Sequence, residues 1–254
     1  MSLLTFSTAN SKLKKLYKVE ELKPWTHRRK IYSLDLLSGW SCPFARECQS
    51  RAIETDEGLR VKDGEHCQFR CFSASQEARL ENVYKKRKRN FEALQSINAQ
   101  RLHGVVKQNK MLELLRDALP SNAGVVRFHC SGDFFNRFYY RAAIKLAESN
   151  PETLFYAYTK AIQFTLEEER PANFIITASR GGTQDSLIDQ HNLREAVVVH
   201  TVRKAEELKL PIDNDDSHAA RPDIQTDSFA LLIHGSQPAG TPAAKAVYQL
   251  RKGA

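Results

Sequence analysis

The sequence predicts an α/β fold built around a parallel sheet. Six short apolar segments alternate along the chain with helical or loop stretches, as in successive βαβ units. They are residues 31–36, 125–130, 154–159, 174–178, 196–202 and 229–234. Polar and glycine-rich residues follow several of these segments. Because parallel sheets and barrels form their sites at the carboxyl ends of the strands, we expect a functional site there.

The first 30 residues are polar and basic, and they predict an N-terminal arm (1–30) ahead of a single α/β domain (31–254). A chain of 254 residues, 41% of them apolar, buries a sizeable core without disulfides. No apolar run approaches the ~18 residues that a membrane helix needs. The first ten residues lack the features of a signal peptide. We therefore expect a cytoplasmic protein without membrane contacts.

Positive charge is concentrated in the first part of the chain. Residues 1–110 contain 22 Lys and Arg against 12 Asp and Glu, whereas the remaining residues contain 16 against 18. Such asymmetry is typical of proteins that contact a polyanion, most often nucleic acid, although it also serves solubility alone.

Four of the five cysteines lie in one loop, predicted over residues 38–74. Cys42, Cys48, Cys67 and Cys71 have the pattern C-x5-C-x18-C-x3-C. In a cytoplasmic chain this clustering indicates metal or redox chemistry rather than disulfides. Four thiolates hold either a zinc ion or a [4Fe-4S] cluster. The first gap of five residues favours iron-sulfur, because structural zinc usually has shorter gaps.

Two further groups are candidates for metal chemistry. Cys130 ends a predicted strand beside His129, where it is either a buried, inert thiol or a thiol that faces the cluster. Asp215, Asp216 and His218 lie in a later polar loop and are candidates for a second metal site.

Segment 76–95 predicts a long amphipathic helix, with Ser73 and Gln76 spaced as a capping box at its start. Four cations project from the side opposite the apolar stripe: Lys85, Lys86, Lys88 and Arg89. They form either a solvated face or a face that contacts phosphates. Arg87 falls inside the apolar stripe, so we expect it to reach solvent, a carboxylate or a bound anion.

Candidate cofactor- or substrate-binding residues follow the predicted strands: Ser131, Gly132, Asp133, Lys160 and Arg180, with Arg87 as a sixth. Asp133 either accepts hydrogen bonds from a ligand amine or ribose, or caps the helix predicted over 136–149. Lys160 and Arg180 either bind a carboxylate or phosphate, or form surface salt bridges.

Five segments carry a resemblance to a known family. They are Ser-Gly-Trp-Ser-Cys-Pro-Phe-Ala (38–45), Cys-Gln-Phe-Arg-Cys-Phe-Ser-Ala (67–74), Phe-His-Cys-Ser-Gly-Asp-Phe-Phe (128–135), Phe-Tyr-Ala-Tyr-Thr-Lys (155–160) and His-Gly-Ser-Gln-Pro-Ala-Gly (234–240). From about residue 30 onward, most of the chain resembles the bacteriophage gene product eighty-eight domain family. The resemblance implies a phage-encoded protein that acts in the cytoplasm of the host cell.

The order of strand, cysteine loop, helix, strand and small-Gly-acid turn is also similar to the front half of radical S-adenosylmethionine (SAM) enzymes. This more distant resemblance implies a partly closed parallel β/α barrel and a [4Fe-4S] cluster with an open iron that binds SAM. By position, Cys67 and Cys71 would be cluster ligands and Ser131-Gly132-Asp133 the turn that holds the SAM amino group. The chain departs from the C-x3-C-x2-C pattern of the superfamily, because Ala74 stands in place of the third cysteine. If all four loop cysteines bind, no iron is open for SAM.

Three hypotheses cover these observations. The first is a phage-type [4Fe-4S] protein on a radical-SAM-like scaffold, with four cysteine ligands and nucleic acid contact through the basic helix. The second is an active SAM-dependent radical enzyme with three cysteine ligands. The third is a zinc-stabilised module that binds nucleic acid or a host protein without chemistry. The chain contains no Walker, G-x-G-x-x-G, H-E-x-x-H or G-x-S-x-G motif, which argues against four common enzyme classes.

Overall fold

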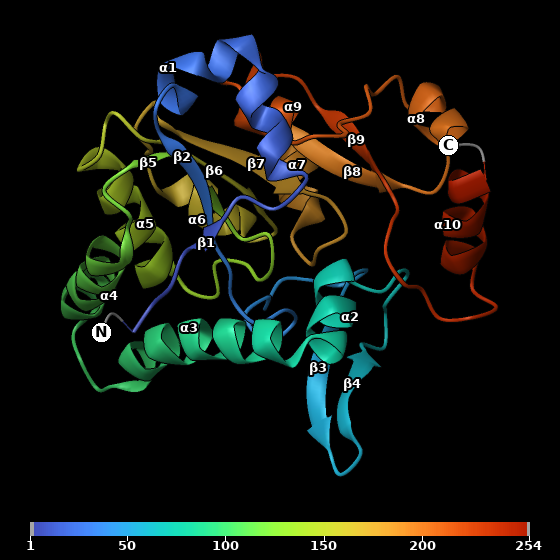
Figure 1. Cartoon of the computed structure of the whole chain (residues 1–254), viewed down its shortest axis with the longest axis horizontal. Helices are drawn as coiled ribbons and strands as arrows, with labels where there is room; N and C mark the ends of the chain where they lie inside the picture. Colours follow the sequence, from blue (N-terminus) through green and yellow to red (C-terminus); the bar gives the residue numbers. More distant parts are fainter. Residues whose placement is uncertain (1–2, 253–254) are drawn as a thin grey trace.

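The computed structural model describes residues 3–252 and has a mixed α/β fold with a mostly parallel central sheet (Figure 1). Residues 1–2 and 253–254, the outer ends of the predicted arm and domain, lie outside the described residues. The sheet has the strand order β1-β2-β5-β6-β7-β8-β9, and only β1 is antiparallel to its neighbour. The predicted parallel α/β fold is thus confirmed. The strands are β1 (Ser7–Thr8), β2 (Lys30–Leu34), β5 (Ala123–Phe128), β6 (Leu154–Thr159), β7 (Phe174–Ser179), β8 (Glu195–Val199) and β9 (Phe229–Leu232).

All six predicted strands are present, with ends shifted by at most a few residues. The strand predicted over 125–130 ends at Phe128, because His129 adopts a positive φ of 67° and leaves the extended conformation. The central strands are mostly apolar because helices and helical turns cover both faces of the sheet.

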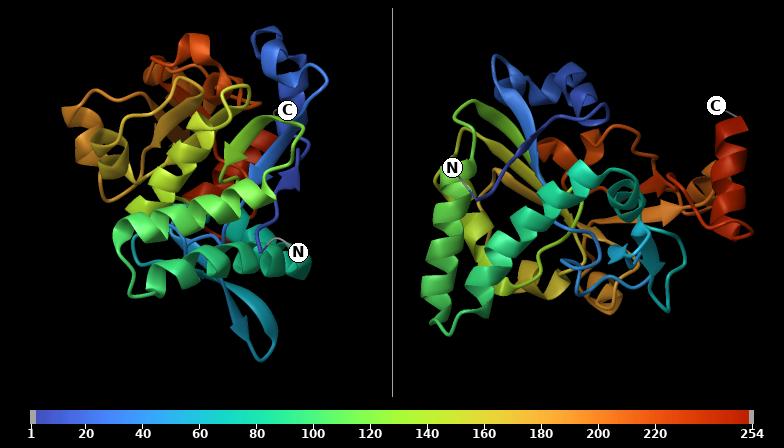
Figure 2. Two further views of the ribbon diagram at one scale, coloured as in Figure 1. Left: turned by 90° about the vertical axis from the view of Figure 1, so that its left-hand side faces the viewer. Right: turned by 60° about the horizontal axis from the view of Figure 1, so that its bottom comes forward.

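One face of the sheet packs on α3 (Glu81–Ala99), α4 (Gly104–Ala118) and α5 (Arg137–Glu148). Figure 2 shows these helices in green and teal, on the side away from the blue N-terminal helices. The core between them is rich in aromatic rings, among them Phe128 of β5 and Tyr139 of α5, both without exposed surface. A closely packed layer of three helices therefore covers this face of the sheet.

The later part of the predicted basic arm lies on the opposite face of the sheet, whereas Leu4 and Phe6 pack on the first face and Ser7–Thr8 forms strand β1. It forms two 3-10 turns (Leu13–Lys18 and Glu20–Leu22) and α1 (Lys23–Thr26). Leu13, Leu16 and Leu22 have no exposed surface and pack with α9 (Ser217–Ala220) on the sheet. The arm is therefore part of the core of the fold.

The remaining helices surround the sheet. They are α6 (Ile162–Glu167), α7 (Asp185–Gln190), α8 (Val202–Glu207), the 3-10 turn Pro222–Ile224 and α10 (Pro242–Lys252). Among residues 3–252 no helix has the length and apolar character required to cross a membrane.

The single helix predicted over 76–95 is two helices, α2 (Phe72–Arg79) and α3, and the prediction was wrong on this point. Leu80 has an extended conformation (φ −122°, ψ 92°) and separates them. The capping box is also absent, because Ser73 lies inside the first turn of α2. Its hydroxyl donates to the carbonyl of Cys130 at 3.0 Å and so ties α2 to the end of β5.

A two-stranded hairpin lies inside the cysteine-rich loop, and the sequence did not reveal it. It consists of β3 (Ser50–Thr55) and β4 (Gly58–Asp63) and projects from the body of the protein below α2 (Figure 1). At its base the amide of Gly64 donates to the carbonyl of Gln49 at 2.6 Å. The two chain segments that carry the cysteines therefore meet at the base of the hairpin.

Candidate functional site

The cysteine-rich loop crosses the carboxyl ends of three strands, where the site was predicted. Its first contact is with the turn after β5. The amide of Leu36 donates to the carbonyl of Ser131 at 2.9 Å, and Gly132 packs against the same loop. Gly132 has a φ of 91°, and a Cβ on it would lie 2.5 Å from the hydroxyl of Ser41, so this close approach requires glycine.

The second contact is with the turn after β7. The amides of Arg46 and Glu47 both donate to the carbonyl of Gly181, at 3.2 and 2.9 Å. Ala45 forms an isolated antiparallel bridge with Gly182. These backbone bonds hold the segment between Cys42 and Cys48 at the carboxyl end of β7.

The third contact is with the segment after β9. The side-chain amide of Gln237 accepts from the amide of Arg70 at 2.7 Å and donates to the carbonyl of Arg70 at 3.0 Å. Phe69 packs on α10, and the ring of Phe72 lies 5.1 Å from that of His234. The segment between Cys67 and Cys71 is thus held by the C-terminal part of the chain.

All four loop cysteines are free thiols, and the hydroxyl of Ser50 lies 3.5 Å from the sulfur of Cys67 and accepts from the amide of Cys71 at 3.2 Å. Burial, with the charges of Asp133, Cys71 and Cys48, raises the pKa of Cys42 well above its usual value. Burial and the charge of Cys48 raise the pKa of Cys71 to about 11, and burial is also the main cause that raises the pKa of Cys67. The shared first cause of these three shifts is burial in the folded loop.

The geometry of these thiols differs from that of a single-ion site. Within residues 3–252, no three His, Cys, Asp or Glu side chains are arranged to hold one metal ion. A [4Fe-4S] cluster has one sulfur ligand for each of four separate irons, so its cysteines do not converge on one point. Four free thiols are the donor type that such a cluster takes, and binding of a cluster stays a prediction.

Asp133 is fully engaged within the fold. Its carboxylate accepts from the hydroxyl of Thr159 at 2.6 Å and from the amides of Lys160 and Phe134 at 2.8 and 2.7 Å. Burial outweighs these bonds and raises its pKa. It does not cap α5, because Asn136 does so by accepting from the amide of Tyr139. Asp133 joins the turn after β5 to the end of β6.

Lys160 and Arg180 also have partners inside the chain. The ammonium of Lys160 donates to the carbonyl and hydroxyl of Ser179 at 3.0 and 2.8 Å and to the carbonyl of Arg180 at 2.7 Å, which uses all three N–H groups. Arg180 pairs with Glu195 and, at 2.6 Å, with Asp189, and these bonds raise its pKa. Of the two alternatives for Arg180, binding of an anionic ligand or a salt bridge within the protein, the structure shows the salt bridge.

Arg87 meets a carboxylate inside the fold. Its guanidinium lies 3.1 Å from Glu77, which has no exposed surface. Glu77 also accepts from the hydroxyls of Ser38 at 2.5 Å and Ser131 at 2.9 Å. Sequence reasoning missed Glu77, although the position of Arg87 in an apolar stripe indicated that such a partner exists.

The four cations of the predicted basic helix all have partners on α3 or next to it. Lys85 pairs with Glu81 at 2.7 Å, and Lys88 pairs with Glu54 at 2.8 Å. Lys86 donates to the hydroxyl of Ser7 at 2.7 Å, and Arg89 donates to that of Thr5 at 2.9 Å. These four cations thus make contacts within the protein. Their contact with nucleic acid stays a prediction.

On the opposite face of the sheet, Asp216 is the centre of an ionic network. Its carboxylate, without exposed surface, pairs with Arg127 and with Lys12 at 2.6 Å, and it accepts from the hydroxyl of Tyr156 at 3.0 Å. Asp216 is therefore neutralised by cations of the protein, which removes the reason to expect a second metal site here. The nearby thiol of Cys130 is half-buried, and desolvation raises its pKa to about 12.

Comparison with known proteins identifies the family. A family model described as Gene product 88 matches residues 2–250. The chain belongs to the Gene product 88 family. No curated protein and no solved structure matches it. The predicted family is thus confirmed, whereas the distant resemblance to radical SAM enzymes gains no support from these comparisons.

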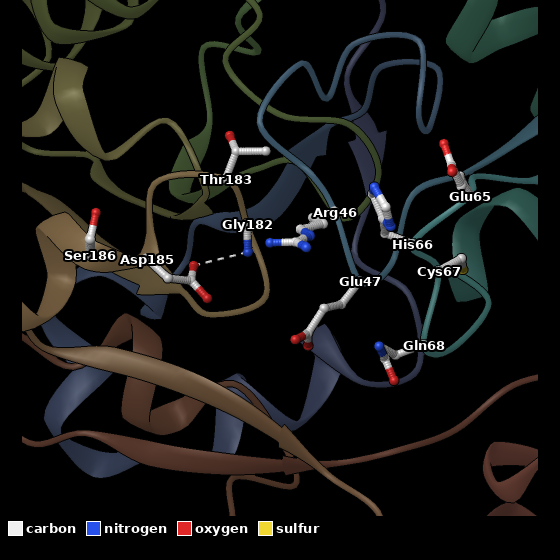
Figure 3. A pocket seen from close by; sticks show the side chains of 10 residues that line it. All are labelled: Arg46, Glu47, Glu65, His66, Cys67, Gln68, Gly182, Thr183, Asp185 and Ser186. Carbon is white, nitrogen blue, oxygen red and sulfur yellow. Dashed lines mark hydrogen bonds between the residues drawn. The ribbon is translucent and has the colours of Figure 1, made fainter.

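This Gene product 88 family protein has a cavity of about 580 Å³ beside the cysteine-rich loop. Figure 3 shows the cavity with His66, Cys67 and Gln68 on one side and the segment from Gly182 to Ser186 on the other. Arg46 and Glu47 lie between these two sides. The cavity therefore borders the cysteine site and the carboxyl end of β7, and no pattern in the sequence indicated it.

Proposed function

We propose that the protein binds a [4Fe-4S] cluster through Cys42, Cys48, Cys67 and Cys71. The observation that supports this is the meeting of the cysteine-bearing segments at the base of the hairpin, where the hydroxyl of Ser50 lies 3.5 Å from the sulfur of Cys67 and accepts from the amide of Cys71 at 3.2 Å. Hydrogen bonds tie each segment that carries these cysteines to a different turn at the carboxyl ends of the strands. Such a frame would position ligands for a cluster at the carboxyl ends of the strands.

The scaffold of this proposal is a partly closed, radical-SAM-like β/α barrel. Strands β2, β5, β6, β7, β8 and β9 are neighbours in the order in which they occur along the chain. This singly wound order is the one in which a β/α barrel is built, whereas doubly wound sheets reverse direction at a switch point. The sheet has edges at β1 and β9.

Among the hypotheses from the sequence, four-cysteine ligation has more support than SAM chemistry. The turn Ser131–Asp133 corresponds by position to the turn that holds the SAM amino group in radical SAM enzymes. Here the hydroxyl of Ser131 donates to Glu77, and the carboxylate of Asp133 accepts from Thr159 and Lys160 at the end of β6. The turn offers no uncommitted carboxylate for an amino group. When bound, a fully ligated cluster would supply electron transfer or structural stability.

The test is anaerobic purification followed by quantitation of iron, zinc and sulfide, with electron paramagnetic resonance spectra of the reduced protein with and without SAM. We expect about four irons and four sulfides per chain and a spectrum that SAM leaves unchanged. A spectrum that SAM perturbs would support the radical enzyme. One zinc and no iron would overturn the proposal in favour of the zinc-stabilised module.

A further inference from the structure

The hairpin of β3 and β4 has its charges separated by face. In an antiparallel ribbon, directly paired residues point to the same side and successive residues alternate. The register therefore places six residues on one side, which we call the cationic face: Arg51, Ile53, Thr55, Gly58, Arg60 and Lys62. The opposite side carries both anions of the two strands, Glu54 and Asp63. All three cations of the strands thus lie on one face and both anions on the other.

The side with the anions packs on the body of the protein. Ala52 of this side has no exposed surface and belongs to a core cluster with residues of α2 and α3. Both anions are neutralised there, because Lys88 of α3 pairs with Glu54 at 2.8 Å and Arg70 pairs with Asp63 at 2.5 Å. The hairpin is therefore docked through its anionic side, and its cationic face is turned away from the helices.

The cationic face is open to solvent. None of its six residues is buried, and Arg60 and Lys62 are exposed. Among residues 3–252, neither Arg51 nor Lys62 forms an ion pair. Arg60 pairs with Glu57 of the turn at 3.1 Å, and both side chains of this pair are more than half exposed, so the pair contributes little energy. The positive charge of this face is thus not used by the fold.

Trp40 restrains one of the three cations. Its indole N–H donates to the carbonyl of Ala52 at 3.1 Å, which fixes the ring beside β3. The guanidinium of Arg51 lies over this ring, 4.7 Å from its centre. Such stacking orients a cation and leaves its charge in place. Arg51 is therefore held at the base of the face without an anion.

The shape of the hairpin indicates which polyanion it fits. It is a two-stranded ribbon with six residues in each strand, and it projects from the body of the protein (Figure 1). The major groove of B-DNA, about 12 Å wide, admits a two-stranded ribbon, whereas the major groove of duplex RNA is too narrow and deep for side chains to read. Arg and Lys side chains in the DNA groove meet guanine N7 and O6 and the flanking phosphates.

We propose that the cationic face of the hairpin binds duplex DNA in the major groove. A face with three cations and no anion is complementary to a polyanion. Because a duplex meets the protein from outside, the cations that bind it must be exposed, as Arg60 and Lys62 are. The cations of α3, in contrast, make contacts within the protein. This inference does not depend on the proposed cluster, and its failure would leave the proposed function untouched.

The first test measures binding of the full chain to a fluorescently labelled DNA duplex at several salt concentrations. Replacement of Arg51, Arg60 and Lys62 together by Gln should lower the affinity by at least about tenfold. The slope of log affinity against log salt should decrease by about 0.9 for each phosphate contact that is lost. Because the variant retains the side of the hairpin that packs on the protein, we expect it to fold.

A variant with Lys14, Lys18 and Lys23 changed to Gln is the matched control. These three lysines are exposed on the N-terminal arm, so the control has the same net charge as the hairpin variant. It should keep most of the affinity of the wild-type protein. Equal losses in the two variants would show that net charge alone attracts DNA and would overturn the inference. Absence of binding by the wild-type protein would overturn it as well.

A gain of affinity gives a test that a folding defect cannot imitate. Glu57→Gln removes the anion beside Arg60 and should strengthen DNA binding about two- to fivefold, the range expected from an exposed pair. Glu206→Gln makes the same change in net charge at an exposed position of α8 and should have no effect. Equal effects of the two substitutions would contradict the role of the hairpin.

The last test separates duplex DNA from other polyanions. Wild-type protein should bind duplex DNA more tightly than duplex RNA of the same sequence, and methylation of guanine N7 should weaken the binding because it blocks an acceptor in the major groove. Equal affinity for the two duplexes, or no effect of methylation, would overturn the assignment to this groove. Tighter binding of poly-L-glutamate at matched charge would instead assign the cationic face to an acidic protein partner.

Discussion

Arg87 of α3 pairs with Glu77 of α2 at 3.1 Å, and the carboxylate of Glu77 has no exposed surface. Glu77 is also bonded to Ser38, at the start of the cysteine-rich loop, and to Ser131, after β5. One buried ion pair therefore connects α2, α3, the cysteine-rich loop and the turn after β5. Cys71 is the N-cap residue of α2, so a movement of this helix would shift Cys71.

We expect Arg87→Met and Glu77→Gln each to lower the free energy of unfolding by about 3–5 kcal/mol, because either change leaves a buried polar or charged partner without its counterpart. Urea unfolding at neutral pH measures the loss. Lys85→Met, which breaks only the exposed pair with Glu81, is the matched control and should change stability little. Losses equal to that of the control would contradict the role assigned to the buried pair.

Gln237→Ala should weaken metal retention without a large loss of stability. The Gln237 side chain forms two hydrogen bonds with the backbone of Arg70, directly before Cys71, from a segment that is distant in sequence. Residues that orient metal ligands contribute about 10–100-fold to metal affinity, and we expect a loss near the lower end of this range. The rate of iron release to a chelator measures it, with the exposed Gln163→Ala as control. Identical release rates would show that these hydrogen bonds are not needed.

Replacement of Lys85, Lys86, Lys88 and Arg89 by Gln tests whether α3 binds nucleic acid. If these cations touch phosphates, the slope of log affinity against log salt should decrease by about 0.7–0.9 for each phosphate that the variant no longer neutralises. Fluorescence anisotropy with a labelled oligonucleotide at several salt concentrations gives the slope. A variant with Lys14 and Lys18 changed to Gln separates this helix from the basic arm. An unchanged slope would leave α3 as a solvated surface.

Asp216 should make the protein sensitive to acid. Burial raises its pKa, but Arg127 and Lys12 outweigh burial and lower the pKa below the ordinary 3.8. A carboxyl with a lowered pKa in the folded state contributes stability above its unfolded pKa, and this contribution is lost as the pH falls through the folded value. Urea unfolding followed from about pH 6 to well below the ordinary pKa of 3.8 should show a smaller loss on acidification for Asp216→Asn than for wild type. Parallel curves for the two proteins would exclude this contribution.

Much of the fold could be predicted from local pattern. The six buried strands were recognised because apolar runs between turn residues are a local signal, and Asn136 to Ser149 was recognised as a helix for the same reason. The break at Leu80 was missed, since no Gly or Pro marks it and the apolar spacing continues across it.

The candidate site was predicted in outline only. The cysteines are a distinctive residue type, so their loop was found, but the partners of Asp133, Lys160 and Arg180 depend on which turns meet at the sheet edge. Charged residues in such turns have the same appearance in sequence whether they bind a ligand or each other. Glu77 illustrates this, because an acidic residue in an amphipathic helix usually faces solvent.

The hairpin explains the spacing of the cysteines. Cys48 and Cys67 are separated by 18 residues in sequence, yet β3 and β4 pair from Ser50 with Asp63 outward, so the chain leaves and returns at nearly the same point. The excursion ends at the exposed turn of Asp56 and Glu57. Its length is therefore decoupled from the geometry of the thiols. A reporter peptide or a binding sequence could be inserted at this tip, and natural variants could differ widely there, without any change in the position of a cysteine.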